Sequence, residues 1–180
     1  MTREDASYFS ILLKNGFHDE YDEWLDRHLE EEDPLSDLVL DLSLCASDVN
    51  ETISCLQNYC ADLPAGELDE SAVCERLRLF LKEAHHANRL SKEQTVDYMF
   101  RFALSHGDPG DFGEGSWNDM YFMGDNYCLT QEGYASWESF DSVFYGYLDH
   151  GIPFVSKPES PCQNEAPKSF FRKFLDRFHK

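Results

Sequence analysis

The residues best suited to chemistry form a few short patterns, and each pattern lacks part of a recognised site. Glu83 and His86 make one Glu-x-x-His step, whereas di-iron helical bundles use two such steps and two further glutamates. The loop that begins at Asp108 places Gly110 and Phe112 where an EF-hand needs oxygen ligands. The zinc-protease, phosphate-loop and dinucleotide motifs are all missing from the sequence. We therefore expect no metal, no cofactor and no enzymatic activity, although an enzyme stays open as an alternative because active sites assemble in space.

The cysteines do not indicate a nucleophile or a disulfide framework. The segment Met1–Asp5 lacks the basic start and long apolar run of a signal peptide, so we expect a cytoplasmic protein whose cysteines are thiols. A reactive thiolate is usually favoured by nearby positive charge, and this chain is strongly negative. The six cysteines are Cys45, Cys55, Cys60, Cys74, Cys128 and Cys162.

Charge is the most unusual property of the composition. Thirty-five acidic residues face fifteen Lys and Arg residues, which gives a formal net charge of −20. Such a field opposes binding to nucleic acid and attracts basic proteins. The chain still has 42% hydrophobic and 14% aromatic residues, so it is expected to fold. No apolar run approaches the roughly 18 residues of a membrane span.

The apolar periodicity predicts a mainly α, single-domain helical bundle or array of about seven to eight helices. In residues 38–44 leucines alternate with polar residues, so a minor β element is the alternative there. Residues 117–123 are expected to be helical, with irregular structure following to residue 132. The other expected helices cover residues 5–15, 18–32, 34–45, 49–61, 69–89, 91–105 and 137–150.

The domain organisation follows from proline content and charge. Residues 1–152 form the acidic helical domain, and residues 153–167, with four prolines, form a linker. Residues 168–180 are expected to form a basic amphipathic helix with five Lys and Arg residues. Charge complementarity favours docking of this helix on the acidic body; binding to a membrane surface or to a partner is the alternative.

The stretch of residues 102–156 has no Lys or Arg, nine acidic residues and 13 of the 26 aromatic residues. Carboxylates beside aromatic anchors make a suitable surface for binding a basic protein. Phe102, Phe140 and Phe144 are assigned to the core by their helical spacing. Tyr134, Tyr147 and the three aromatic residues of the predicted site are better candidates for the surface, although a core position stays equally open for all five. The predicted partner-binding residues are Trp117, Asp119, Tyr121, Asp125 and Tyr127, with Glu138 and Asp141 as supporting charges.

A second acidic region offers an alternative site. Asp19–Asp41 contains eleven acidic residues and a single base, Arg27. Together with the base-free stretch, the helical layout and the lack of a catalytic motif, this profile resembles the small acidic immunity proteins with which bacteria neutralise their own secreted toxins. The resemblance implies a stoichiometric inhibitor that covers the basic active site of a toxin, such as a nuclease. The rival hypothesis is a self-associating helical scaffold or regulatory protein, and the sequence specifies neither the partner nor the oligomeric state.

Overall fold

The computed structural model describes residues 1–63, 68–108 and 116–153. Within these residues the chain forms eight α-helices and no strand. They are α1 (Arg3–Lys14), α2 (Asp19–Glu31), α3 (Asp37–Cys45), α4 (Val49–Asp62), α5 (Glu70–His86), α6 (Lys92–His106), α7 (Ser116–Gln131) and α8 (Trp137–His150).

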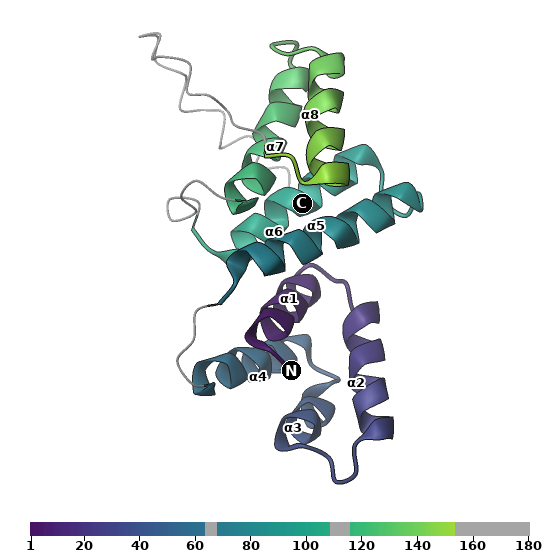
Figure 1. The fold of residues 1–180 in the computed structure, drawn as a ribbon, viewed down its shortest axis with the longest axis vertical. Coiled ribbons are helices and arrows are strands. Elements are labelled where there is room, and N and C mark those ends of the chain that lie inside the picture. The colour runs from purple at the N-terminus through teal and green to yellow at the C-terminus, as the bar shows by residue number, and fades with distance from the viewer. Residues whose placement is uncertain (64–67, 109–115, 154–180) are drawn as a thin grey trace.

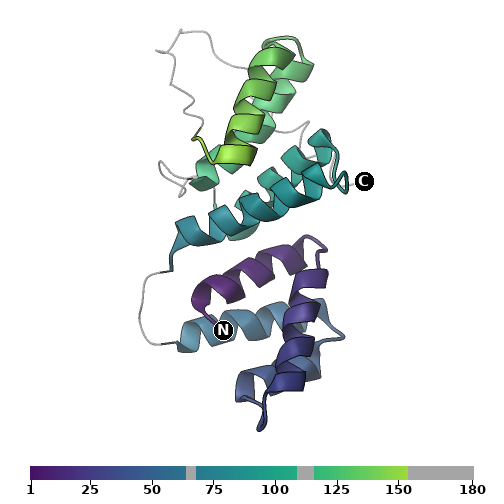
Figure 2. The same cartoon turned by 45° about the vertical axis from the view of Figure 1, so that its right-hand side comes forward.

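The helices form two lobes that share one core. Helices α1–α4 make the N-terminal lobe, and α5–α8 make the C-terminal lobe (Figure 1). Helix α1 packs on α4 within its own lobe and on α5 and α6 across the boundary. Figure 2 shows α5, α1 and α4 as three successive layers. Because buried residues from all eight helices join a single cluster, the two lobes belong to one domain.

Helix α1 is the central element of this arrangement. A reciprocal capping box between Thr2 and Asp5 starts the helix, which satisfies backbone donors that would otherwise lack partners. From Tyr8 to Leu13 every side chain is buried. A helix buried on all sides must have neighbours on all sides, and α1 has α4 on one side and α5 and α6 on the other.

Polar caps and one glycine define several of the other helix ends. Ser91 and Gln94 form a second capping box at the start of α6, and Ser136 accepts a hydrogen bond from the Ser139 amide at the start of α8. Gly151 ends α8 in the left-handed conformation at φ 64°, which glycine adopts without steric cost.

The boundary between the lobes combines apolar packing with one ion pair. Arg76 of α5 places its Nη1 2.7 Å from Oδ1 of Asp5 on α1. The same guanidinium lies 3.8 Å from the centre of the Tyr8 ring, a cation–π arrangement. Burial by itself would raise the pKa of the Asp5 carboxyl group. The hydrogen bonds from the Thr2 amide and Arg76 together have the larger effect, so the pKa of Asp5 lies below its ordinary value.

The predicted fold class is confirmed, and so is a helix within residues 34–45, although its start and the end of a later helix differ from the prediction. Residues 38–44 are helical, which excludes the alternative of a strand there: Val39 and Leu42 point to the core while Leu40 and Leu44 are exposed. Helix α3 starts at Asp37, three residues later than expected, after the cis peptide bond at Pro34.

Helix α7 is the second correction. It continues to Gln131 with no irregular segment after Met123. Its apolar side chains surround the helix axis because α7 packs against α5, α6 and α8. Such a helix has no clear apolar stripe for periodicity to detect. The predicted linker and basic C-terminal helix lie outside the described residues, apart from Pro153.

Candidate functional site

The aromatic residues predicted to bind a partner are largely packed in the core. Trp117 and Tyr121 of α7 are buried, at 4% and 8% exposure. The Trp117 ring stacks on His106 with ring centres 4.1 Å apart and planes within 8°, and Tyr121 stacks on Phe100. Tyr127 is half-buried and packs edge-on against Phe140. These rings hold α7 in place and are not available as exposed anchors.

The predicted charged residues differ from one another in burial and in ion pairing. Asp141 of α8 lies 2.6 Å from the Lys92 ammonium group, and Asp119 is half-buried. Burial raises the pKa of the Asp125 carboxyl group. Glu138 is exposed at the start of α8. The structure therefore places all seven predicted residues on α7 and α8 but does not gather them into one exposed surface.

Of the surface aromatic candidates, Tyr147 is buried at 3% exposure and Tyr134 is exposed at 76%. The core assignments of Phe102, Phe140 and Phe144 are confirmed.

A groove between α3 and α4, at the opposite end of the molecule, has the properties expected of the binding site. It has a volume of about 630 Å³, which lies within the range of ligand-binding pockets. Five carboxylates line it, and its lining includes no Lys or Arg. We call this feature the α3–α4 groove; its acidic residues are Asp37, Asp41, Asp48, Glu51 and Asp62.

Helical spacing explains why these carboxylates share the groove. Asp37 and Asp41 are four residues apart on α3, so they lie on one side of the helix, while Val39 and Leu42 face the core. Asp48 is the N-cap of α4 and accepts hydrogen bonds from the amides of Asn50 and Glu51. The N-cap hydrogen bonds fix the entry of the chain into α4.

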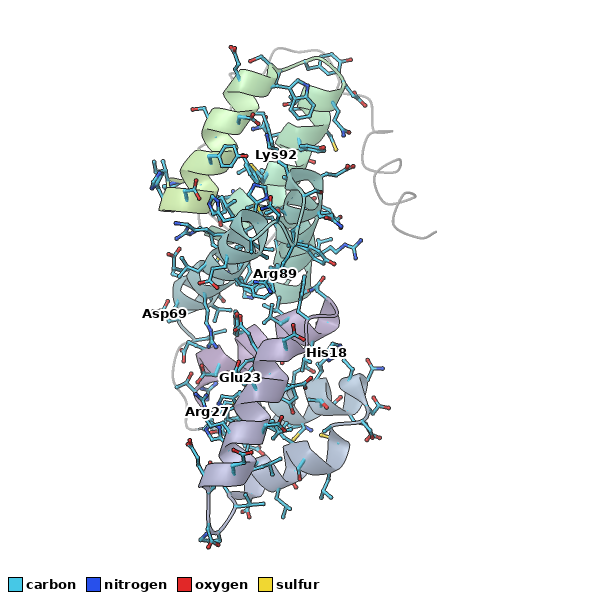
Figure 3. The ribbon with its side chains drawn as sticks, turned by 90° about the vertical axis from the view of Figure 1, so that its right-hand side faces the viewer. His18, Glu23, Arg27, Asp69, Arg89 and Lys92 are labelled. Carbon is cyan, nitrogen blue, oxygen red and sulfur yellow. The ribbon has the colours of Figure 1, made fainter. Side chains whose placement is uncertain are left out.

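The groove carboxylates are electrostatically unpaired. None of the five forms an ion pair with another residue in the part of the chain that the structure describes. Glu23 and Arg27 lie on α2, a neighbouring helix of the same lobe that does not line the groove (Figure 3). A concave surface that carries one sign of charge concentrates its field and attracts oppositely charged molecules.

Apolar groups complete the surface. Leu38, Cys55 and Tyr59 contribute apolar atoms to the groove lining. On α3, Leu40 is 46% exposed and Leu44 is 76% exposed. By helical spacing Leu44 lies beside Asp37 and Asp41. The surface can therefore contact both the charged and the apolar side of an amphipathic segment.

The cysteine thiols at this surface and in the core are not activated as nucleophiles. Burial, with the neighbouring Cys45 and Asp41, raises the pKa of the Cys55 thiol, which disfavours the nucleophilic thiolate. Elsewhere, burial raises the pKa of Cys74 to about 12. Over residues 1–63, 68–108 and 116–153 no group of three His, Cys, Asp or Glu side chains is arranged to hold a metal ion. In the same residues no helix has the length and apolar character needed to cross a membrane.

Sequence reasoning found two of the five groove carboxylates. Asp37 and Asp41 belong to the acidic region predicted as the alternative site, whereas Asp48, Glu51 and Asp62 of the α4 segment were missed. The available signal was the spacing of polar residues along one side of α4, at positions 51, 54, 58 and 62. No family model, curated protein or solved structure matches this chain.

Proposed function

We propose that this protein is a binding module that captures a basic protein in the α3–α4 groove and acts as its stoichiometric inhibitor. The class of partner that fits the proposal best is a secreted toxin, such as a nuclease, whose active site carries positive charge for its phosphate substrate. An acidic inhibitor of this kind occupies the site in place of the phosphates.

The observation that carries the proposal is the groove with five unpaired carboxylates and no base. Exposed charges of one sign steer a partner of the opposite sign and raise its association rate. The neighbouring exposed leucines, Leu40 and Leu44, supply the apolar contact that charges alone do not give.

A pull-down from the native cell tests the proposal. The full chain should retain a basic protein at low salt and release it at high salt, because screening weakens interactions between exposed charges. The variant Asp41→Lys/Glu51→Lys should lose this protein. Recovery of no basic protein by the unmodified chain would contradict the proposal.

A matched control separates the groove from net charge. Glu83→Lys/Glu93→Lys changes two exposed carboxylates of the C-terminal lobe and shifts the net charge by the same amount. Glu93, like Glu51, lies in the first turn of its helix. The control should retain the partner, and equal losses in both variants would show that binding depends on overall charge alone.

Self-association is the second candidate function, and one observation favours it. Leu29, Leu35, Leu40 and Leu44 are all exposed at the α2–α3 end of the N-terminal lobe. Exposed apolar side chains gathered in one region often mark protein interfaces. A scaffold role predicts a symmetric oligomer that Leu40→Gln/Leu44→Gln converts to a monomer on light scattering, whereas the inhibitor role predicts that the unmodified chain is already monomeric.

A further inference from the structure

We infer that the α3–α4 groove also receives the chain's own residues 168–180, which compete there with the basic partner. As a statement about regulation, this inference rests on the proposed function. The docking itself requires no partner and is tested on the isolated chain.

Charge complementarity is the first argument. Residues 168–180 carry five Lys and Arg residues and a single acid, Asp176. The groove offers five carboxylates and no base. Because the groove carboxylates have no ion-pair partner among the described residues, a basic segment would satisfy charges that the fold leaves unmatched.

Apolar complementarity is the second argument. The same thirteen-residue segment contains four phenylalanines, at positions 170, 171, 174 and 178. The groove lining provides Leu38, Cys55 and Tyr59, and the exposed Leu40 and Leu44 lie on the same helix as Leu38. Removing these groups from water together is favourable, at about 25 cal/mol per Å² of apolar surface.

The chain length permits this docking. The end of α8 is held against α5, where Arg78 donates to the Leu148 carbonyl and Lys82 Nζ lies 2.8 Å from the Asp149 carbonyl oxygen. Helices α5, α1 and α4 are successive layers (Figure 2), and packed helices lie about 8–10 Å apart, so α4 is roughly 20 Å from α5. Residues 154–167 can extend over roughly 45 Å at about 3.3 Å per residue.

The C-terminal lobe offers a poorer site for the same segment. Three of its carboxylates already have Lys or Arg partners: Asp141 pairs with Lys92, Asp97 with Arg101 and Glu75 with Arg78. A basic segment docking at these three carboxylates would have to displace their partners. The groove requires no such exchange, which favours it as the place where residues 168–180 dock.

Intramolecular docking would set a threshold for the partner. A tethered segment acts at an effective concentration that reaches millimolar values for short linkers. A basic partner must therefore exceed the affinity of the chain's own segment to open the groove. A weakly basic protein would be rejected, and a specific partner would be accepted.

Zero-length carbodiimide cross-linking of the full chain, followed by mass spectrometry, tests the inference directly. The reagent joins a lysine amine to a carboxylate that contacts it. We expect cross-links from Lys168, Lys173 or Lys180 to the groove, and a loss of at least about fivefold at high salt, where exposed charge pairs are screened. The acceptors should be Asp37, Asp41, Asp48, Glu51 and Asp62.

Two variants sharpen the result. In Asp41→Lys/Glu51→Lys the cross-links to Asp37, Asp48 and Asp62 should fall, whereas Glu83→Lys/Glu93→Lys should leave them unchanged. Adding Lys173→Glu to the groove variant should restore part of the signal at the remaining groove carboxylates, since the charges are then exchanged.

The last question is whether each cross-link forms within one chain or between two chains. In a mixture of isotopically light and heavy chains, cross-links within one chain support the inference. Cross-links that join light to heavy chains show that a second copy occupies the groove, and this would overturn it. So would cross-links confined to other acidic residues. If the cross-links are absent but the pull-down still recovers a basic partner, the docking inference fails and the proposed function stands. If the cross-links form but no partner is recovered, the docking stands and the proposed function fails.

Discussion

The two lobes of this protein use their charges in opposite ways. In the C-terminal lobe Glu75, Asp97, Asp141 and Asp149 each lie within ion-pair distance of a basic or histidine side chain. In the N-terminal lobe, residues 1–63 contain sixteen acidic residues and three Lys and Arg residues. Only one of these acids, Asp5, has an ion pair among the described residues, and its partner Arg76 belongs to the other lobe.

This difference shows what each lobe contributes. Charges paired within the fold help hold helices together, as between α6 and α8 through Lys92 and Asp141. Charges left unpaired on a surface repel one another and lower stability, and a function can explain their retention. Arg89 and Lys92 lie in the C-terminal lobe (Figure 3), and residues 68–153 contain six Lys and Arg residues against three in residues 1–63, so the basic side chains are unevenly shared.

The largest expected effect comes from removing the buried arginine of the C-terminal lobe, Arg78. Arg78 is 5% exposed, pairs with Glu75 at 2.5 Å and donates to the Leu148 carbonyl at the end of α8. Arg78→Ala should lower the free energy of unfolding by about 2–3 kcal/mol, because hydrogen bonds that involve a charged group contribute most. Urea denaturation followed by circular dichroism measures this change.

Arg27→Ala is the matched substitution in the N-terminal lobe. Arg27 is exposed on α2 and should change stability by less than about 0.5 kcal/mol, as most surface substitutions do. Equal effects of the two substitutions would contradict the contrast between the lobes.

Neutralising carboxylates should have opposite effects in the two lobes. Asp37→Asn/Asp41→Asn/Glu51→Gln relieves repulsion in the groove and should raise the free energy of unfolding by about 0.5–1 kcal/mol at low salt. Because the repulsion is screened, this gain should shrink as salt is added. Asp48 stays unchanged because it caps α4.

The corresponding triple change in the C-terminal lobe is Glu75→Gln/Asp141→Asn/Asp149→Asn. It removes three paired carboxylates and should lower stability by about 1 kcal/mol, as expected for partly exposed ion pairs. Thermal melts at two salt concentrations compare the variants, and a shift of the same sign in both lobes would refute the comparison.

The smallest expected effect concerns a buried charge in the C-terminal lobe. Burial raises the pKa of Asp125 in the folded state, so the folded protein binds this proton more tightly than the unfolded chain. The carboxyl group's contribution to stability is therefore present at low pH and is lost as the pH rises through the raised pKa. Asp125→Asn should raise Tm by roughly 2 °C at neutral pH.

The difference between Asp125→Asn and the unmodified protein should narrow as the pH falls through the raised pKa. Asp26→Asn, at an exposed position of α2, is the control and should leave Tm nearly unchanged. A constant Tm difference at every pH would show that the change acts through packing and not through the charge.

The sequence predicted the elements of the fold better than their environment. Strong apolar stripes and polar caps located α5, α6 and α8 within a few residues. Helix α7 was cut short because its neighbours on several sides remove the stripe that periodicity detects. Trp117 and Tyr121 were assigned to a binding surface because composition along the chain does not reveal which rings will be enclosed by α6.

The candidate site depends on tertiary structure in the same way. Asp37 belongs to the acidic run of residues 19–41, whereas Glu51 lies outside it on the next helix. The packing of α3 against α4 brings both carboxylates to one groove. A run of acidic residues was visible in the sequence, but its concave shape was not. The paired state of Asp141 was hidden for the same reason, since Lys92 lies 49 residues away.

The central claim is that the α3–α4 groove, and not overall acidity, captures a basic partner. The most direct measurement is the association rate and Kd of the captured protein, by surface plasmon resonance, for the unmodified chain, Asp41→Lys/Glu51→Lys and Glu83→Lys/Glu93→Lys. The account predicts a slower association and at least about tenfold weaker binding for the groove variant, equivalent to about 1.4 kcal/mol, with little change for the control. Equal weakening of both variants, or no change in either, would contradict it.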